Sequence, residues 1–202
     1  MCERIDIAQF IKVYMNFLRR GGMALPTAKI INLHRLENAD ACLKKLVAQP
    51  GFENVRHIRI IADGTPKRRD RECDLLHIER STCLHNFGDY GYYLFPYKTA
   101  AGNWQPGYME DLLKETLRQE TSESCHHECL HNMAADFLMS ANNNRGRNDK
   151  FTNYNRHLLC TYFAATLSLA GLKLGEAAEA GAFDLGSAKF NDLKDMMSRL
   201  IL

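Results

Sequence analysis

Short apolar runs alternate with helix-like patterns along the first 118 residues of the chain. Three of these runs have the length and composition that are typical of strands. The predicted strands cover 28–33, 56–62 and 90–96. The predicted helices in the same half cover 5–20, 38–49, 66–83 and 105–117. Strands that alternate with helices in this way predict an α/β fold with a small, mainly parallel sheet flanked by helices.

The first predicted helix has the clearest apolar spacing. Its hydrophobic side chains recur every three or four positions, which predicts one buried stripe. The stripe consists of Ile7, Phe10, Ile11, Tyr14 and Phe17. Gly21 and Gly22 follow it and are expected to end the helix. The helix over 38–49 is expected to use Asn38 as its N-cap.

Beyond residue 118 the pattern is helical only. Further helices are expected at 123–141, 153–170, 173–181 and 188–202. We therefore expect an α/β core over 1–118 and a C-terminal helical extension over 119–202, packed together as one structural unit. No internal repeat and no low-complexity linker separates the two parts.

Composition and charge exclude several classes of protein. With 46% hydrophobic and 25% charged residues, the chain resembles an ordinary globular protein. The formal net charge of +2 provides no overall field for nucleic acid or membrane, so any basic surface must be local. No apolar run approaches the ~20 residues that span a bilayer. Seven cysteines without a signal peptide indicate a cytoplasmic protein with reduced thiols.

Acidic residues stand near the ends of the predicted strands or just after them. They are Glu3, Asp6, Asp63, Glu110 and Asp111. Ligands of open α/β sheets bind at the carboxyl edge of the strands, and carboxylates gathered there are suitable ligands for Mg²⁺ or Mn²⁺. The residues alone leave two interpretations of Asp63. It either caps the helix that follows or holds a metal ion.

Four segments in order resemble an uncharacterised prokaryotic family. That family has a Toprim-like domain and is grouped with the Toprim part of OLD-type (overcoming lysogenisation defect) nucleases. The segments are CERIDIAQFIK, FENVRHIRIIADGTP, YLFPYKTAAGNWQPGYMEDLL and GLKLGEAAEAGAFDLGSAKFNDLKDMM. The resemblance covers nearly the whole chain and implies a Toprim-like sheet.

The resemblance also implies a role for the acidic residues. Glu3 matches the Toprim glutamate, Asp63 the first aspartate of an Asp-x-Asp pair, and Glu110 with Asp111 the acidic pair of the later helix. By this likeness Glu3, Asp63 and Glu110 would be catalytic. They would hold Mg²⁺ or Mn²⁺ together with Asp111 or Asp6, and the metal would support phosphodiester cleavage.

The chain departs from the family pattern at several positions. Arg4 replaces the glycine after the glutamate, and Thr65 occupies the second aspartate position. If Arg4 points inward, it compensates the acidic charge and replaces the metal ion. The resemblance further implies a strand before Glu3, where only Met1 and Cys2 stand. Either the true start lies upstream, or the protein lacks most of that strand.

Basic residues follow Asp63 in the stretch TPKRRDR. Lys67, Arg68, Arg69 and Arg71 would bind phosphate beside the acidic site, or they form an exposed helical face. A second polar stretch, NNNRGRNDK with Arg156, is either a phosphate contact or a solvated connector. The segment CHHECLH at 125–131 is typical of buried helical thiols and solvated histidines. It is not typical of a zinc site, because four side chains on one helix do not all point toward a single metal ion.

Two functions therefore remain open from the sequence. The first is a nucleic-acid-associated, metal-dependent nuclease-like domain that binds DNA or another nucleic acid. The second is a degenerate, non-catalytic interaction subunit that partners a separately encoded ATPase, because OLD-type proteins join an ATPase to a Toprim domain. Arg4, Thr65 and the short first strand favour the second function, whereas Glu110, Asp111 and the basic stretch favour the first.

Overall fold

A computed structural model describes residues 2, 4–64, 68–81, 89–97, 105–118, 124–146, 153–166 and 168–200. Within them, side chains are not described at 68–70, 72, 79, 81 and 124–128. The N-terminal elements are α1 (Ile5–Arg20), α2 (Ala39–Val47), β1 (Ile58–Asp63), α3 (Arg68–Ser81) and β2 (Tyr90–Phe95). The later helices are α4 (Met109–Glu115), α5 (Ser124–Asn143), α6 (Tyr154–Ala165), α7 (Leu174–Glu179) and α8 (Asn191–Ser198). Short 3₁₀ turns cover Leu36–Asn38, Phe52–Asn54 and Ala188–Phe190.

The two strands form a parallel sheet, which confirms the predicted α/β class. Ile58 pairs with Tyr90 at one end and Asp63 with Phe95 at the other. The predicted boundaries of both strands are correct to within two residues. All six residues of β1 are buried, because helices cover both faces of the sheet, as is usual for parallel strands.

Two single-residue bridges extend the sheet beyond β1. Cys2 forms parallel bridges with Ile61 on one side and with Asn32 on the other. The strand predicted at 28–33 is therefore wrong as a continuous strand, since the structure has only a bridge at Asn32. Its neighbour in the sheet is the segment at Cys2, and one described residue there cannot support a ladder of hydrogen bonds.

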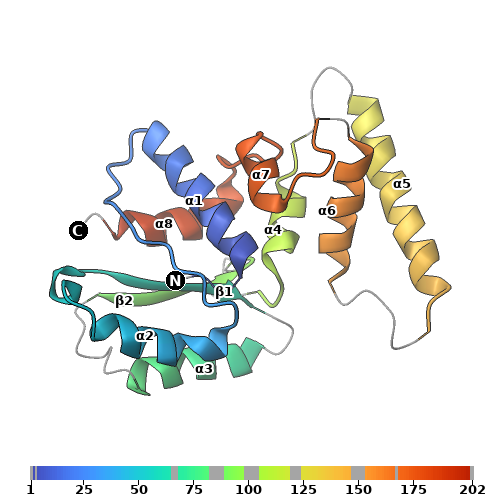
Figure 1. Cartoon of the computed structure of the whole chain (residues 1–202). Helices are drawn as coiled ribbons and strands as arrows, with labels where there is room; N and C mark the ends of the chain where they lie inside the picture. The colour runs from blue at the N-terminus through green and yellow to red at the C-terminus, as the bar shows by residue number, and fades with distance from the viewer. Residues whose placement is uncertain are drawn as a thin grey trace.

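Helices form layers around this small sheet (Figure 1). Helices α1 and α8 lie on one face and α2 and α3 on the other, while α4, α6 and α5 follow one another away from the sheet. Helix α4 packs against α6, and α6 against α5. Within the described part of the chain, no helix is long and apolar enough to cross a bilayer.

Helix α1 begins and ends as the sequence predicts, with one correction to its buried stripe. Ile7, Phe10, Ile11 and Tyr14 are buried, but Phe17 is 37% exposed and Leu18 is buried instead. The buried face drifts because the helix has 3.6 residues per turn, and a four-residue step from Tyr14 reaches Leu18.

A glycine allows α7 to pack closely on α1. A Cβ atom at Gly175 would lie 2.7 Å from the Cβ of Gln9. Leu174, Ala177 and Ala178 of the same helix are buried. The Leu-Gly-Glu-Ala-Ala segment therefore provides a smooth face for helix packing. Residues after 118 also pair with the N-terminal half, since the N–H of Arg118 donates to the carbonyl of Ala182.

Several helix ends differ from the predicted ones. The helix expected over 105–117 begins at Met109, and the one expected over 153–170 ends at Ala165. The helix expected over 188–202 is a 3₁₀ turn followed by α8, which ends at Ser198. Asn38 stands at the start of α2 but does not act as predicted. Its side-chain amide donates to the carbonyl of Leu33 rather than accepting from the helix.

Candidate functional site

The candidate site lies at the topological switch point of the sheet, where neighbouring strands lead to opposite edges. The order across the sheet is Asn32, Cys2, β1, β2, so the chain leaves Cys2 toward one edge and leaves β1 toward the other. In parallel sheets, ligands bind outside the carboxyl ends of such neighbouring strands. Arg4 follows Cys2 by two positions, and Asp63 is the last residue of β1. Both therefore stand at this switch point.

Asp63 caps the start of helix α4. The sequence suggested a cap for the helix that follows Asp63, and residues 65–67, just before that helix, lie outside the described part of the chain. Oδ1 of Asp63 accepts a hydrogen bond of 2.8 Å from the backbone N–H of Met109, the first residue of α4. Such an N–H has no partner within its own helix. The carboxylate is nearly fully buried, with 4% of its side chain exposed. Asp63 thus connects the end of β1 to the start of α4.

Arg4 joins this aspartate to a second buried carboxylate. Its Nε lies 3.0 Å from Oδ2 of Asp63, close enough for an ion pair although the angle is not that of a hydrogen bond. Its Nη2 donates to both carboxylate oxygens of Glu110, at 2.9 and 3.1 Å. The side chain of Glu110 is fully buried. A buried carboxylate needs such a partner, because its desolvation alone costs several kcal/mol.

A second arginine completes the cluster from α6. Nη2 of Arg156 lies 2.9 Å from Oδ2 of Asp6, and its Nη1 lies 3.7 Å from Oε1 of Glu110. The packing of α6 on α4 places Arg156 there. The neighbouring Asn155 strengthens the same contact, since its amide donates to Oδ1 of Asp111 at 2.7 Å.

We call the five residues Arg4, Asp6, Asp63, Glu110 and Arg156 the arginine–carboxylate cluster. It contains three carboxylates and two guanidinium groups. Burial disfavours the charge on Arg4, yet Asp63, Glu110 and Asp6 outweigh this effect and raise the pKa of Arg4 above its ordinary value. Arg4 therefore stays protonated.

The position of the cations at helix starts is unusual. Arg4 is the N-cap of α1, and Arg156 lies in the first turn of α6. The positive end of a helix dipole disfavours cations and favours carboxylates such as Asp6 and Glu110. The arginines are therefore held by the carboxylates that they contact. The cluster is an ion-pair network that ties together the starts of three helices and the end of one strand.

The predicted metal ligands are only partly brought together. Asp6, Asp63 and Glu110 meet in the cluster, whereas Glu3 lies outside the described residues. Asp111 faces another set of partners, because its Oδ2 accepts the N–H of Tyr108 at 2.7 Å and its Oδ1 accepts from Asn155. Asp111 thus caps its own helix.

A divalent ion does not fit the cluster as the side chains stand. Among the described residues there is no group of three or more His, Cys, Asp or Glu side chains arranged to hold a metal. The Arg4 guanidinium contacts the same oxygens of Asp63 and Glu110 that a cation would need. Mg²⁺ or Mn²⁺ binding stays a prediction, and it requires Arg4 to move.

The structure does not describe the side chains of most of the predicted phosphate-binding residues. Lys67 lies outside the described residues, as does Thr65, and the side chains of Arg68 and Arg69 at the start of α3 are likewise not described. Arg71 is half-buried and already has an interaction partner. In the 125–131 segment, Cys129 is exposed, and His131 packs edge-on against Tyr162.

The sequence pointed to Arg4 as a residue that could replace a metal ion, but it left Arg156 as either a phosphate contact or part of a solvated connector. A charge balance could have identified Arg156. Three carboxylates gathered at one edge of a sheet beside a single arginine favour a further cation nearby. Asn155, next to Arg156, also binds a carboxylate of α4, because its side-chain amide donates to Asp111.

Comparison with protein-family models, with curated proteins and with solved structures gives no significant match for this chain.

Proposed function

We propose that this protein is a Toprim-like α/β protein in which Arg4 takes the place of a catalytic metal ion, and that it works as a non-catalytic interaction subunit. The observation that carries the proposal is the position of the Arg4 guanidinium between Asp63 and Glu110. The sequence resemblance supplies the Toprim-like part, and the mixed α/β fold with a parallel sheet is compatible with it.

The energetics of the cluster support this proposal. Mg²⁺ demands near-ideal octahedral geometry and loses its water reluctantly. To reach Asp63 and Glu110 it would have to displace a guanidinium that contacts three of their four oxygens. Arg4 would then lose its ion pairs while still partly buried, which is a costly change. Arginine and metal ion are therefore alternatives at this site.

An exposed apolar surface supports the interaction role. On the outer helix α5, Met133 is 61% exposed and Phe137 is 64% exposed. They are four residues apart and so share one face of the helix. Exposed apolar side chains grouped on one face are typical of protein–protein contacts. We propose a polypeptide partner for this face, and the resemblance suggests a separately encoded ATPase.

The interaction role can be tested with that partner. We expect the protein to co-elute with an OLD-type ATPase encoded in the same genome during gel filtration. Replacement of Met133 and Phe137 by serine should abolish co-elution and leave the unfolding temperature unchanged, since both side chains are exposed. Absence of co-elution for the wild-type protein would overturn this assignment of partner.

A metal-dependent nuclease is the second candidate function. It is favoured by the convergence of Asp6, Asp63 and Glu110 at the carboxyl edge of the sheet, where α/β proteins bind ligands. In this function Arg4 would swing away, and Mg²⁺ or Mn²⁺ would bind the freed carboxylates and nucleic acid beside them. The basic residues from Lys67 to Arg71 would then contact phosphate.

Cleavage assays separate the two functions. Wild-type protein and Glu110→Gln are incubated with supercoiled and linear DNA over a range of Mg²⁺ and Mn²⁺ concentrations. The interaction role predicts that neither protein cleaves. Cleavage by the wild type that is lost in Glu110→Gln would overturn that role and establish the nuclease. Equal cleavage by both would indicate a contaminating nuclease, and repeated purification would remove it.

A further inference from the structure

A pocket of about 560 Å³ lies beside β1, apart from the arginine–carboxylate cluster. Its lining includes Ile58 and Arg59 at the amino end of the strand, whereas Asp63 of the cluster stands at the carboxyl end. None of the five cluster residues lines the pocket. Pockets of about 300–1,000 Å³ are typical of sites for small molecules. The size of this pocket therefore suits a small-molecule ligand.

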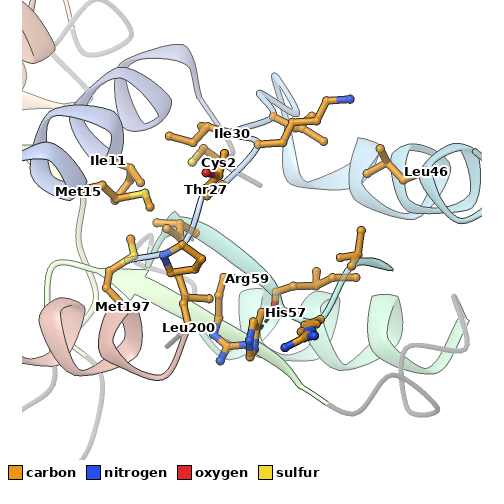
Figure 2. Close-up of a pocket in the computed structure, with 18 of the residues that line it drawn as sticks. Cys2, Ile11, Met15, Thr27, Ile30, Leu46, His57, Arg59, Met197 and Leu200 are labelled. Carbon is orange, nitrogen blue, oxygen red and sulfur yellow. Dashed lines mark hydrogen bonds between the residues drawn. The ribbon is translucent and has the colours of Figure 1, made fainter. Parts of the chain in front are cut away.

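Two helices supply an apolar floor to the pocket. Ile11 and Met15 of α1 and Met197 of α8 line it, and all three side chains are buried. Figure 2 shows these three residues on one side of the pocket and His57 with Arg59 on another. In small-molecule sites the apolar lining holds the body of the ligand, and a few polar groups fix its orientation. The pocket has both kinds of lining.

Several apolar side chains of the lining are only partly covered by the protein itself. Ile30, Ile31 and Leu46 are half-buried, and Val55 is 39% exposed. The removal of apolar area from water favours binding roughly in proportion to the area removed. An apolar chain in the pocket would cover these side chains and be stabilised by that burial.

Among the described residues, the lining has basic side chains but no Asp or Glu. The basic residues are Lys29, Arg56, His57 and Arg59. His57 and Arg59 already pair with Asp89. Lys29 and Arg56 are exposed, and neither has an ion-pair partner within the described part of the chain. These two cations are therefore the groups with which an anionic ligand would pair.

We propose that this pocket binds an amphipathic anion, a molecule in which an apolar chain ends in one carboxylate or phosphate group. The chain would lie along the apolar floor, and the anionic group would pair with Lys29 and Arg56. Because a water-sized group occupies about 30 Å³ in a liquid, a pocket of about 560 Å³ has room for a chain of about ten carbons and its head group. The proposal is independent of the function assigned to the arginine–carboxylate cluster.

Titration of the complete protein with probes that share one alkyl chain tests the proposal. The probes are decanoate, decyl phosphate and decanol, each kept below the concentration at which it forms micelles or separates from water. The methionine methyl groups are labelled with ¹³C and followed by NMR, because Met15 and Met197 line the pocket. Met109 is the internal reference, since it is buried in α4 and is not part of the lining.

We expect the anionic probes to shift the methyl signals of Met15 and Met197 saturably and to leave Met109 unchanged. At least one anion should bind about tenfold more tightly than decanol, because it forms two additional ion pairs, and the tighter of the two anions identifies the head group. Shortening that anion by two CH₂ groups should weaken binding roughly tenfold. The proposal is overturned if neither anion shifts Met15 and Met197, or if decanol binds as tightly as both anions.

A double substitution tests the position of the head group. Lys29→Gln with Arg56→Gln removes both cations of the proposed site. The matched control is Lys12→Gln with Arg20→Gln, which removes two exposed cations of α1 that do not line the pocket. Both variants should unfold at the wild-type temperature, because all four side chains are exposed.

We expect the first variant to bind the preferred anion about tenfold more weakly than the wild type and to bind decanol unchanged. The control variant should bind both probes as the wild type does. Equal affinity of the two variants for the anion would show that Lys29 and Arg56 do not hold the head group, and the proposal would be overturned.

Discussion

The guanidinium of Arg4 contacts both carboxylate oxygens of Glu110 across a separation of 106 positions in the chain. Through the same side chain it reaches Asp63 at the end of β1. One arginine at the start of α1 therefore joins the sheet to α4. The chemistry of the candidate site and the stability of the fold depend on the same contacts, and both can be probed by substitution.

Replacement of Arg4 by alanine should destabilise the protein strongly. Glu110 is fully buried and Asp63 nearly so, and removal of their cation leaves buried charges uncompensated. Breaking a buried ion pair in this way costs about 3–5 kcal/mol in the free energy of unfolding. Urea denaturation of the variant measures the loss. The control is Arg118→Ala, because Arg118 is exposed and lies 3.8 Å from Asp184. A loss of similar size in both variants would contradict the special role of Arg4.

Two substitutions at Asp63 separate its two contacts. Asparagine keeps an oxygen that can accept the N–H of Met109 but loses the charge that attracts Arg4. Alanine loses both. We therefore expect Asp63→Ala to be less stable than Asp63→Asn by about 1 kcal/mol, the usual contribution of a helix cap. Equal free energies of unfolding for the two variants would show that Asp63 does not cap α4.

Gly64 should not tolerate a side chain. A Cβ atom there would lie 2.5 Å from the carbonyl oxygen of Phe95 and 3.2 Å from that of Gln105. Both are backbone atoms that cannot move away easily, so Gly64→Ala should cost about 1–3 kcal/mol or more through overpacking. Gly186→Ala is the matched control, since its Cβ would make only ordinary contacts of 3.5 and 3.9 Å. Thermal unfolding compares the two, and equal unfolding temperatures would refute the steric argument.

The helices were largely predictable from the sequence, whereas contacts between distant residues were not. The stripe from Ile7 to Tyr14 identified α1 because helical hydrogen bonds are local and the buried face repeats within the segment. The strand expected at 28–33 failed because a strand needs a neighbour, and Cys2 supplies only one bridge. The local pattern of apolar residues at 28–33 does not show whether another strand lies beside that segment.

The candidate site shows the same limit. From the rule that ligands bind at the carboxyl edge of strands, the sequence predicted a site of Glu3, Asp6, Asp63, Glu110 and Asp111. The structure brings Asp6, Asp63 and Glu110 together. Asp111 instead caps its own helix, and Glu3 lies outside the described residues. The sequence also indicated that Arg4 could replace a metal ion. It did not identify Arg156, because the packing of α6 on α4 depends on tertiary structure. The sequence also did not show that Asp63 caps α4 at Met109, because these residues are 46 positions apart and meet only in the folded structure.

Stability should also depend on pH through Asp89 at the other end of β1. Burial alone would raise the pKa of Asp89, but hydrogen bonds from Arg59 and His57 outweigh it and hold this pKa below the ordinary value of 3.8. A lowered pKa in the folded state means that the folded protein binds fewer protons than the unfolded chain near that pH. The stabilisation is therefore complete above about pH 5 and is lost as the pH falls through 3.8 and below.

Asp89→Asn tests this dependence. The wild type should unfold at a higher temperature than the variant at pH 7, and the difference should shrink as the pH falls below about 4. Thermal unfolding of both proteins from pH 7 to pH 3 measures it. If the difference in unfolding temperature between the two proteins grew toward low pH, it would contradict the lowered pKa of Asp89 in the folded protein.

The central claim is that Arg4 and a divalent metal ion are alternatives at the same carboxylates, and Mn²⁺ titration by calorimetry tests it most directly. The proteins compared are the wild type, Arg4→Ala, and Arg4→Ala combined with Glu110→Gln. We expect no saturable heat for the wild type, one Mn²⁺ site in Arg4→Ala, and loss of that site in the double variant. A single Mn²⁺ site in the wild type that disappears in Asp63→Asn would contradict the claim and restore the metal-dependent function.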